Sequence, residues 1–318
     1  GATIGWTPSS DIVNALEPFT NITQKAIFGY GTTGSVVSMS NLVSSSGVVA
    51  TDVTGVGTAR RNVGAASYGG DKAIFGYGFS TGDVSLTNLV SNSGVVSADV
   101  TGVGTARRQV GATTYGTDKA IFGYGYNGSS MVSLTNLVSN SGVVATDTTG
   151  VGTARSGVAA AGYGSTGQAI FGYGSTTGDG SGRVSMTNLV TNVGVVGTDV
   201  TGVGTARYGL AAASYGGDKV IFGYGADALD SGLSLTNLVN NSGVVAADVS
   251  GVGTARADIA ASGYGGDKAI FGFGYVSSTT SRTAITNLVS NTGVVASNVT
   301  GVGTARSGLG AAGYSNTA

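Results

Sequence analysis

Six near-copies of one unit of about 48 residues fill the chain from Lys25 to its end. Every copy contains the motif G-V-G-T-A-R, and every copy contains A-I-F-G-Y-G or a variant of it with one substitution. A period of this length is typical of solenoids, arrays and propellers, whose units bury their apolar faces against one another. Although 318 residues would suggest two domains, the repeats predict a single domain over residues 25–318.

One unit reads as a set of short strands. In the second copy, four apolar stretches at residues 63–68, 72–77, 84–90 and 95–100, here called segments a, b, c and d, are separated by clusters of Gly, Ser, Asn and Asp. Such clusters mark tight turns between strands. No stretch has the spacing of an amphipathic helix, and glycine is too frequent for one. We therefore expect an all-β fold.

Segments a and b differ in the size of their side chains. Segment a is built from small residues, as at 158–161, which suits an inner strand around a narrow channel. Segment b carries bulky residues such as Ile74 and Phe75 in adjacent positions. Adjacent residues of a strand point to opposite faces, so both faces of each sheet are expected to pack against neighbouring sheets.

The position of Arg60 before segment a and the G-Y-G after segment b resemble the kelch repeat of β-propellers, over residues 25–318. Two features depart from it: Tyr77 separates the glycine pair, and aliphatic residues such as Val95 stand where kelch repeats have Trp. The resemblance implies an all-β, six-bladed β-propeller with four antiparallel strands per blade. The uniformity of the copies is also similar to that of propellers associated with phages and other virions.

The two ends of the repeat array are complementary. The first copy starts at segment b, residues 25–30, and the last copy ends with segment a, residues 307–314. The kelch resemblance implies that residues 307–314 complete the first blade and close the ring. Residues 1–24 precede the array and are expected to be an N-terminal arm or linker, either for attachment or as a lid over the first blade.

Variation among the copies is concentrated at two places. From the Asn of segment c to the next motif arginine the spacing is 19 residues in all six copies, whereas the b-to-c loops differ in length and composition. The two residues after each motif arginine also vary. In an antiparallel meander both places lie on one face, which favours a diversified binding face. The alternative is that surface loops vary because insertions there cost little.

Aromatic side chains among Ser, Gly, Asn and Asp resemble the chemistry of a paratope. The candidate ligand-binding residues from the loops are Phe79, Asp83, Tyr126, Asn127, Asp179, Arg183, Asp227, Asp230, Tyr275 and Arg282. Those that follow a motif arginine are Arg61, Arg108 and Tyr208.

Two residues recur in every copy and are expected to be structural. The motif arginines are Arg60, Arg107, Arg155, Arg207, Arg256 and Arg306. We expect them to bond carbonyls or the acid of segment d, which is Asn298 in the sixth copy; the alternative is a ring that binds carboxylate or phosphate. The segment-c asparagines are Asn41, Asn88, Asn136, Asn188, Asn237 and Asn287. Buried or bulge positions that satisfy backbone groups suit asparagine.

Several function classes lack the residues they need. The chain has no His and no Cys, which removes imidazole and thiolate chemistry, and Asp179 stands in no series of carboxylates of the kind that calcium needs. We expect no metal, no cofactor and no enzymatic activity. Only 10% of residues are charged and the net charge is -1, which disfavours a nucleic-acid partner. The sequence contains no run of 18 apolar residues, so we expect no membrane insertion.

The expected function is a non-enzymatic recognition or adhesion module, displayed on a virus particle or outside a cell. Its partner would be a host-surface glycan or protein, bound through the b-to-c and d-to-a loops. One alternative is a structural or decoration module of a virion or extracellular assembly, in contact with other subunits or with itself as a homo-oligomer. Another is an intracellular kelch adaptor between proteins.

Overall fold

The computed structural model describes residues 23–178 and 181–318, which form an all-β structure with almost no helix. Its strands build repeated three-stranded antiparallel sheets in which segment b lies between segments a and c. Within the described residues the only helical turn is η2, Ser277–Thr279, and no helix has the length and apolar character needed to cross a membrane. The predicted arm falls almost entirely on residues 1–22, outside the described residues.

The strand bounds repeat closely from copy to copy. Segment a forms β3 (Gly64–Tyr68), β6 (Gly111–Tyr115), β9 (Ala159–Tyr163), β12 (Ala211–Tyr215), β15 (Ala260–Tyr264) and β20 (Gly310–Tyr314). Segment b forms β1 (Lys25–Gly29), β4 (Lys72–Gly76), β7 (Lys119–Gly123), β10 (Gln168–Gly172), β13 (Lys219–Gly223) and β16 (Lys268–Gly272). Segment c forms β2 (Ser40–Val43), β5 (Thr87–Val90), β8 (Thr135–Val138), β11 (Thr187–Val190), β14 (Thr236–Val239) and β19 (Thr286–Val289). A short ribbon, β17 (Tyr275–Val276) with β18 (Ser281–Arg282), lies in the last b-to-c loop.

Segment d differs from the expected fourth strand. In the second copy it meets strand c only at two isolated bridges, Val90 with Val96 and Thr87 with Val100. Between these bridges segment d advances by four residues and strand c by three, so one extra residue interrupts the ladder, as in a β-bulge. The side-chain amide of Asn88 donates to the Ser97 carbonyl (3.0 Å) at this interruption. Each sheet therefore has three regular strands and a bridged outer segment.

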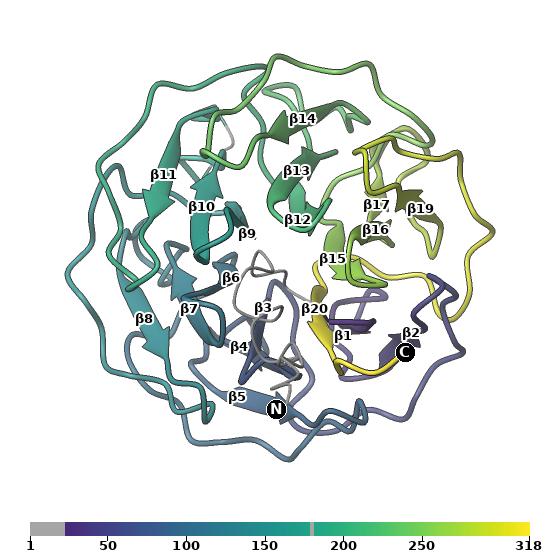
Figure 1. Cartoon of the computed structure of the whole chain (residues 1–318), viewed down its shortest axis with the longest axis horizontal. Helices are drawn as coiled ribbons and strands as arrows, with labels where there is room; N and C mark the ends of the chain where they lie inside the picture. The colour runs from purple at the N-terminus through teal and green to yellow at the C-terminus, as the bar shows by residue number, and fades with distance from the viewer. Residues whose placement is uncertain (1–22, 179–180) are drawn as a thin grey trace, which may run out of the picture.

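The sheets lie around a common centre, with the segment-a strands innermost (Figure 1). Each inner strand neighbours the inner strands of two other sheets, in the order β3, β6, β9, β12, β15, β20 and back to β3. Strand β20 pairs antiparallel with β1, from Lys25 opposite Tyr314 to Gly29 opposite Gly310. The last strand of the chain thus belongs to the same sheet as the first, and the arrangement is consistent with a β-propeller.

The hydrophobic core lies between the sheets. Every core cluster joins the isoleucine of one segment-b strand to the phenylalanine of the next: Ile27 packs with Phe75, and Ile74 packs with Phe122. These side chains are fully buried. Because Ile74 and Phe75 point to opposite faces of β4, each central strand belongs to two cores and links three successive sheets.

The glycine that ends segment b makes this packing possible. A Cβ on Gly76 would lie 2.7 Å from Cζ of Phe122 in the next sheet, closer than carbon atoms can approach. The same relation recurs in the other copies, for example between Gly172 and Phe222. The F-G pair in A-I-F-G therefore reflects the contact between one sheet and the next.

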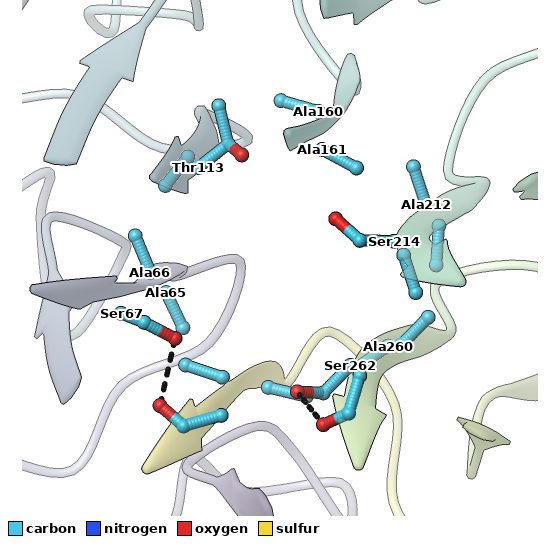
Figure 2. A pocket seen from close by; sticks show the side chains of 18 of the residues that line it. Ala65, Ala66, Ser67, Thr113, Ala160, Ala161, Ala212, Ser214, Ala260 and Ser262 are labelled. Atoms are coloured by element: carbon cyan, nitrogen blue, oxygen red, sulfur yellow. Dashed lines mark hydrogen bonds between the residues drawn. The ribbon is translucent and has the colours of Figure 1, made fainter. Parts of the chain in front are cut away.

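The inner strands surround a central cavity of about 140 Å³. Small side chains from different sheets line it, among them Ala66, Thr113, Ala161, Ser214 and Ser262 (Figure 2). The hydroxyl of Ser67 donates to the Gly313 carbonyl (2.7 Å) and that of Ser214 to the Gly162 carbonyl (2.7 Å). These hydroxyls thus join neighbouring inner strands. Larger residues would not fit where so many strands approach one another.

Candidate ligand-binding face

The structure brings the two variable parts of each repeat together. The residue after the motif arginine pairs with the first residue of the b-to-c loop, and that residue pairs in turn with the last residue of the loop. In the second copy these are Arg61, Phe79 and Asp83. Their backbones are hydrogen bonded, from Arg61 N–H to the Phe79 carbonyl (2.9 Å) and from Phe79 N–H to the Arg61 carbonyl (2.8 Å). We call the surface formed by these residues and loops the variable face.

The same bridge holds both ends of every loop. The triads of the other copies are Arg108, Tyr126 and Met131; Ser156, Ser175 and Arg183; Tyr208, Ala226 and Gly232; Ala257, Tyr275 and Arg282; and Ser307, Thr32 and Val36. Nine of the predicted ligand-binding residues belong to these triads, and Asn127, Asp227 and Asp230 lie in the loops that the triads close. The fixed ends explain how loops of different length fit on repeats of constant spacing.

The motif arginines lie beneath this face and are completely buried. Nε of Arg60 donates to the Tyr77 carbonyl (2.9 Å), Nη1 to the Thr58 carbonyl (3.1 Å), and Nη2 to Oδ1 of Asn88 (2.6 Å). The equivalent arginines make the same set of bonds, and Arg306 makes it across the chain ends, to Tyr30, Thr304 and Asn41. Three of the five N–H donors are used in this way, and because the side chain is completely buried, an external anion cannot reach the guanidinium. Burial lowers the pKa of Arg306 to about 10, although the nearby carboxylate of Asp52 acts to raise it.

Each motif arginine also connects two sheets. The guanidinium carbon of Arg60 lies 4.2 Å from the ring centroid of Tyr30, which belongs to the preceding sheet. The same tyrosine meets Phe75 edge to face, with centroids 5.2 Å apart. Tyr30 and its equivalents have left-handed backbones, with φ of 65° at Tyr30, a conformation that non-glycine residues rarely adopt. Hydrogen bonds from arginine to the carbonyls of these residues hold the backbone there.

The aspartate of segment d also takes part in the connection between neighbouring sheets. The carboxylate of Asp99 accepts from the backbone N–H of Thr58 (3.0 Å) and its hydroxyl (2.6 Å), and from the Asn88 amide (2.9 Å). Partial burial raises the pKa of Asp99, but the hydrogen bonds from Thr58 and Asn88 outweigh it and hold the pKa below its ordinary value. Gly57 leaves room for this contact, because a Cβ there would collide with the Asp99 carboxylate.

A cleft of about 310 Å³ opens on the variable face. Its walls come from three successive repeats, the third to the fifth: Arg108, Gln109, Tyr126, Met131, Ser156, Ser175, Thr177, Gly178, Tyr208 and Asp230. Arg108, Tyr126, Tyr208 and Asp230 are thus predicted ligand-binding residues that the structure brings to one place. Nothing in the sequence distinguishes these three repeats as the ones that enclose a cleft.

Two ion pairs flank the cleft. Nη1 of Arg108 lies 2.9 Å from Oδ1 of Asp83, and its guanidinium carbon lies 4.9 Å from the ring centroid of Phe79 and 4.8 Å from that of Tyr126. Arg183 is paired with Asp230, and its guanidinium carbon lies 4.4 Å from the centroid of Tyr208. Each pair fixes an aromatic ring beside an arginine.

The remaining candidates that the structure describes lie outside the cleft lining. Oδ1 of Asn127 accepts from the backbone N–H of Ser130 (2.8 Å), and Oδ1 of Asp227 accepts from that of Leu229 (2.9 Å), so both side chains stabilise their own turns. Tyr275 and Arg282 pair across β17 and β18 in the sixth copy. Asp179 lies outside the described residues.

Sequence reasoning missed a rim of left-handed residues around the centre of the variable face. They are the second residues after the motif arginines: Asn62, Gln109, Gly157, Gly209, Asp258 and Gly308, with φ between 50° and 64°. Backbone N–H groups link them from sheet to sheet, for example from Gln109 to the Asn62 carbonyl (3.0 Å) and from Asn62 to the Gly308 carbonyl (2.6 Å). The preference for Gly, Asn and Asp at this position was the available signal.

Among the described residues no three or more acidic groups lie together in a way that could hold a metal ion. No model of a known protein family and no curated protein matches the chain.

Proposed function

We propose that the chain is a six-bladed kelch-like β-propeller, closed by β20, that acts as a non-enzymatic recognition module. In this proposal the variable face binds a glycan or a protein on a host surface, and the module is displayed on a virus particle or outside a cell. The order of the inner strands and the pairing of β20 with β1 support the closed ring.

One observation carries the functional proposal: the variable parts of the repeats converge on a single face, whereas the rest of each repeat keeps its spacing and contacts. The face combines rigid aromatic rings with small polar side chains, as binding surfaces of paratope type do. Its cleft is of the size of the smaller ligand sites in proteins. The chain has no histidine, the most frequent general base, and no cysteine nucleophile, which favours binding over catalysis.

The proposal is tested by exchanging loops. Replacing residues 126–131, 175–183 and 275–282 by the short loop of the first copy removes the variable contacts and keeps the bridges that close each loop. We expect the exchanged chain to unfold at the same temperature as the parent and to lose binding to host cells or to a glycan array. Binding that survives the exchange would contradict the proposal.

A second candidate function is a structural or decoration module. Segment d lies at the outer edge of each sheet and exposes a valine at the same position of every repeat, by 60% to 66%: Val48, Val95, Val143, Val195, Val244 and Val294. Valine side chains at this edge favour packing of the ring beside other subunits or copies of itself. Light scattering of the isolated chain at high concentration tests self-association. An oligomer that dissociates when these valines are changed to Thr would support the homo-oligomer, and a parent chain that is monomeric would count against it.

A further inference from the structure

The cleft between the third and fifth repeats is electrically balanced. Its walls include one cation, Arg108, and one anion, Asp230, and each has its partner in place, Asp83 and Arg183. An anionic ligand that bonds Arg108 would compete for its charge with Asp83, which is largely buried, with its side chain 10% exposed, and would weaken the ion pair. Separating a partly buried ion pair leaves the other charge uncompensated and costs free energy. The cleft is therefore suited to a ligand that carries no net charge.

Two tyrosine rings are held in position at the cleft before any ligand arrives. Arg108 packs on Tyr126 and Arg183 packs on Tyr208, and the hydroxyl of Tyr126 donates to the Gly128 carbonyl (3.0 Å). A Cβ on Gly157 would lie 3.1 Å from Cδ2 of Tyr208, so this ring lies directly on the rim backbone. Burial raises the pKa of Tyr208, which keeps its phenol neutral. Fixed aromatic rings offer apolar area to C–H groups at little entropic cost.

The rest of the lining consists mainly of small polar groups. The hydroxyl of Ser156 donates to Oε1 of Gln109 (3.2 Å) and that of Ser175 to the Thr177 carbonyl (2.8 Å). Met131 is the only aliphatic side chain in the lining as the structure describes it. The anchor residues of a polypeptide partner fill well-packed, desolvated pockets, whereas polar groups make up most of this lining. Hydroxyl, amide and paired-charge groups beside aromatic rings suit a ligand with many hydroxyls and apolar C–H faces.

We propose that this cleft is a subsite for an uncharged saccharide, recognised by stacking on Tyr126 and Tyr208 and by hydrogen bonds from the polar lining. This inference rests on the proposed function of the variable face, and it adds the chemical class of the ligand and the location of its binding site. It predicts that neutral sugars bind, and that sialylated, uronic or sulfated forms of the same sugars bind much more weakly.

The first test presents the full chain with neutral oligosaccharides and with their sialylated and sulfated counterparts, at low salt and at about 0.5 M salt, where exposed charge interactions are screened. We expect a neutral sugar to bind equally at both salt concentrations, and the anionic counterparts to bind at least about tenfold more weakly, because each would compete with an ion pair that is already in place. Binding of anionic sugars alone, binding that disappears at high salt, or selective binding of polypeptide would overturn the inference.

The second test locates the site by substitution. Tyr126→Ala and Tyr208→Ala are each expected to weaken binding of the neutral sugar by about tenfold or more, as the loss of an aromatic anchor does. Thr177→Trp fills the cleft from an exposed position and keeps both rings, so it reports on the cleft even where a tyrosine variant unfolds. Lys119→Ala, at the opposite turn of the third repeat, is the control. Unchanged binding in Thr177→Trp would overturn the inference.

The two proposals fail differently. Loss of binding on loop exchange together with full binding by the cleft variants would remove the cleft assignment and leave a ligand-binding variable face. Binding that survives the loop exchange would remove both.

Discussion

Asn298 is a residue of the arginine network at a position where the chain itself varies. In the other copies an aspartate lies here, 3.7 to 4.0 Å from the motif arginine. Oδ1 of Asn298 still accepts from the Thr254 N–H (3.1 Å) and from the Asn287 amide (3.1 Å), but the buried Arg256 has no carboxylate at this position. The sixth copy thus shows the arginine network without the negative charge of the aspartate, while the hydrogen bonds to the side-chain oxygen are retained.

Asn298→Asp is expected to stabilise the protein by up to about 1 kcal/mol, because it supplies the missing charge to Arg256 at a partly exposed site. Denaturant unfolding at neutral pH measures the change. Asp99→Asn, the reverse substitution in another copy, should lower the free energy of unfolding by a similar amount. A destabilising Asn298→Asp would contradict the role given to the carboxylate.

The aspartates of segment d also predict how stability depends on pH. Their pKa values lie below the ordinary value, because hydrogen bonds from Thr and Asn outweigh partial burial; they are Asp52, Asp99, Asp147, Asp199 and Asp248. A lowered folded-state pKa means that these groups contribute stability that is fully present above the unfolded-state pKa of about 4 and is lost as the pH falls through the folded-state values. Thermal unfolding between pH 7 and 3 should therefore show a decline below about pH 4 that is smaller in Asp99→Asn.

The buried guanidinium itself should be far more sensitive to change. Arg107→Lys removes the fork that bonds Tyr124, Thr105 and Asn136 and the planar group over Tyr77. We expect a loss of about 3 kcal/mol, the cost of leaving buried polar groups without partners. Arg108→Lys, at the adjacent and partly exposed position, is the matched control and should cost much less. Comparable losses in the two variants would contradict the structural role of Arg107.

At the scale of the strands, the contact of one sheet with the next depends on the glycine that ends segment b. Gly76→Ala places a methyl group against Phe122 and is expected to cost about 1–3 kcal/mol by overpacking. Gly82→Ala is the control, because nothing lies within 4 Å of a Cβ built there. Equal unfolding free energies for the two variants would show that the sheets can separate without loss.

Strand positions were largely predictable from the sequence, and the irregular parts were not. Segments a and b were expected at 63–68 and 72–77 and form β3 and β4, because short runs of small or apolar residues between glycine-containing turns determine them locally. Segment d has the same strand-like composition, yet the Asn88 side chain takes a place in its ladder. The left-handed rim and the cleft depend on contacts between repeats that no single repeat encodes, so the sequence showed their residues but not their assembly.

At the scale of the whole molecule, the pairing of β20 with β1 joins the two ends of the repeat array. Deleting residues 307–318 exposes the edge of β1 and removes Leu309 and Ala312 from two of the cores. We expect this truncated chain to lose its cooperative unfolding transition and to aggregate. Deleting only the exposed residues 316–318 is the control and should leave the transition unchanged; a cooperative transition in the longer deletion would contradict the importance of this pairing.

The bridges that hold both ends of each b-to-c loop have a consequence for how such a protein can change. A new insert needs to satisfy its own two anchor positions and any ion pair with the neighbouring repeat, such as that of Arg183 with Asp230, and the arginine network beneath it keeps its bonds. Binding specificity can therefore change one loop at a time, by recombination between copies or by laboratory grafting, while the stability of the whole protein is largely kept.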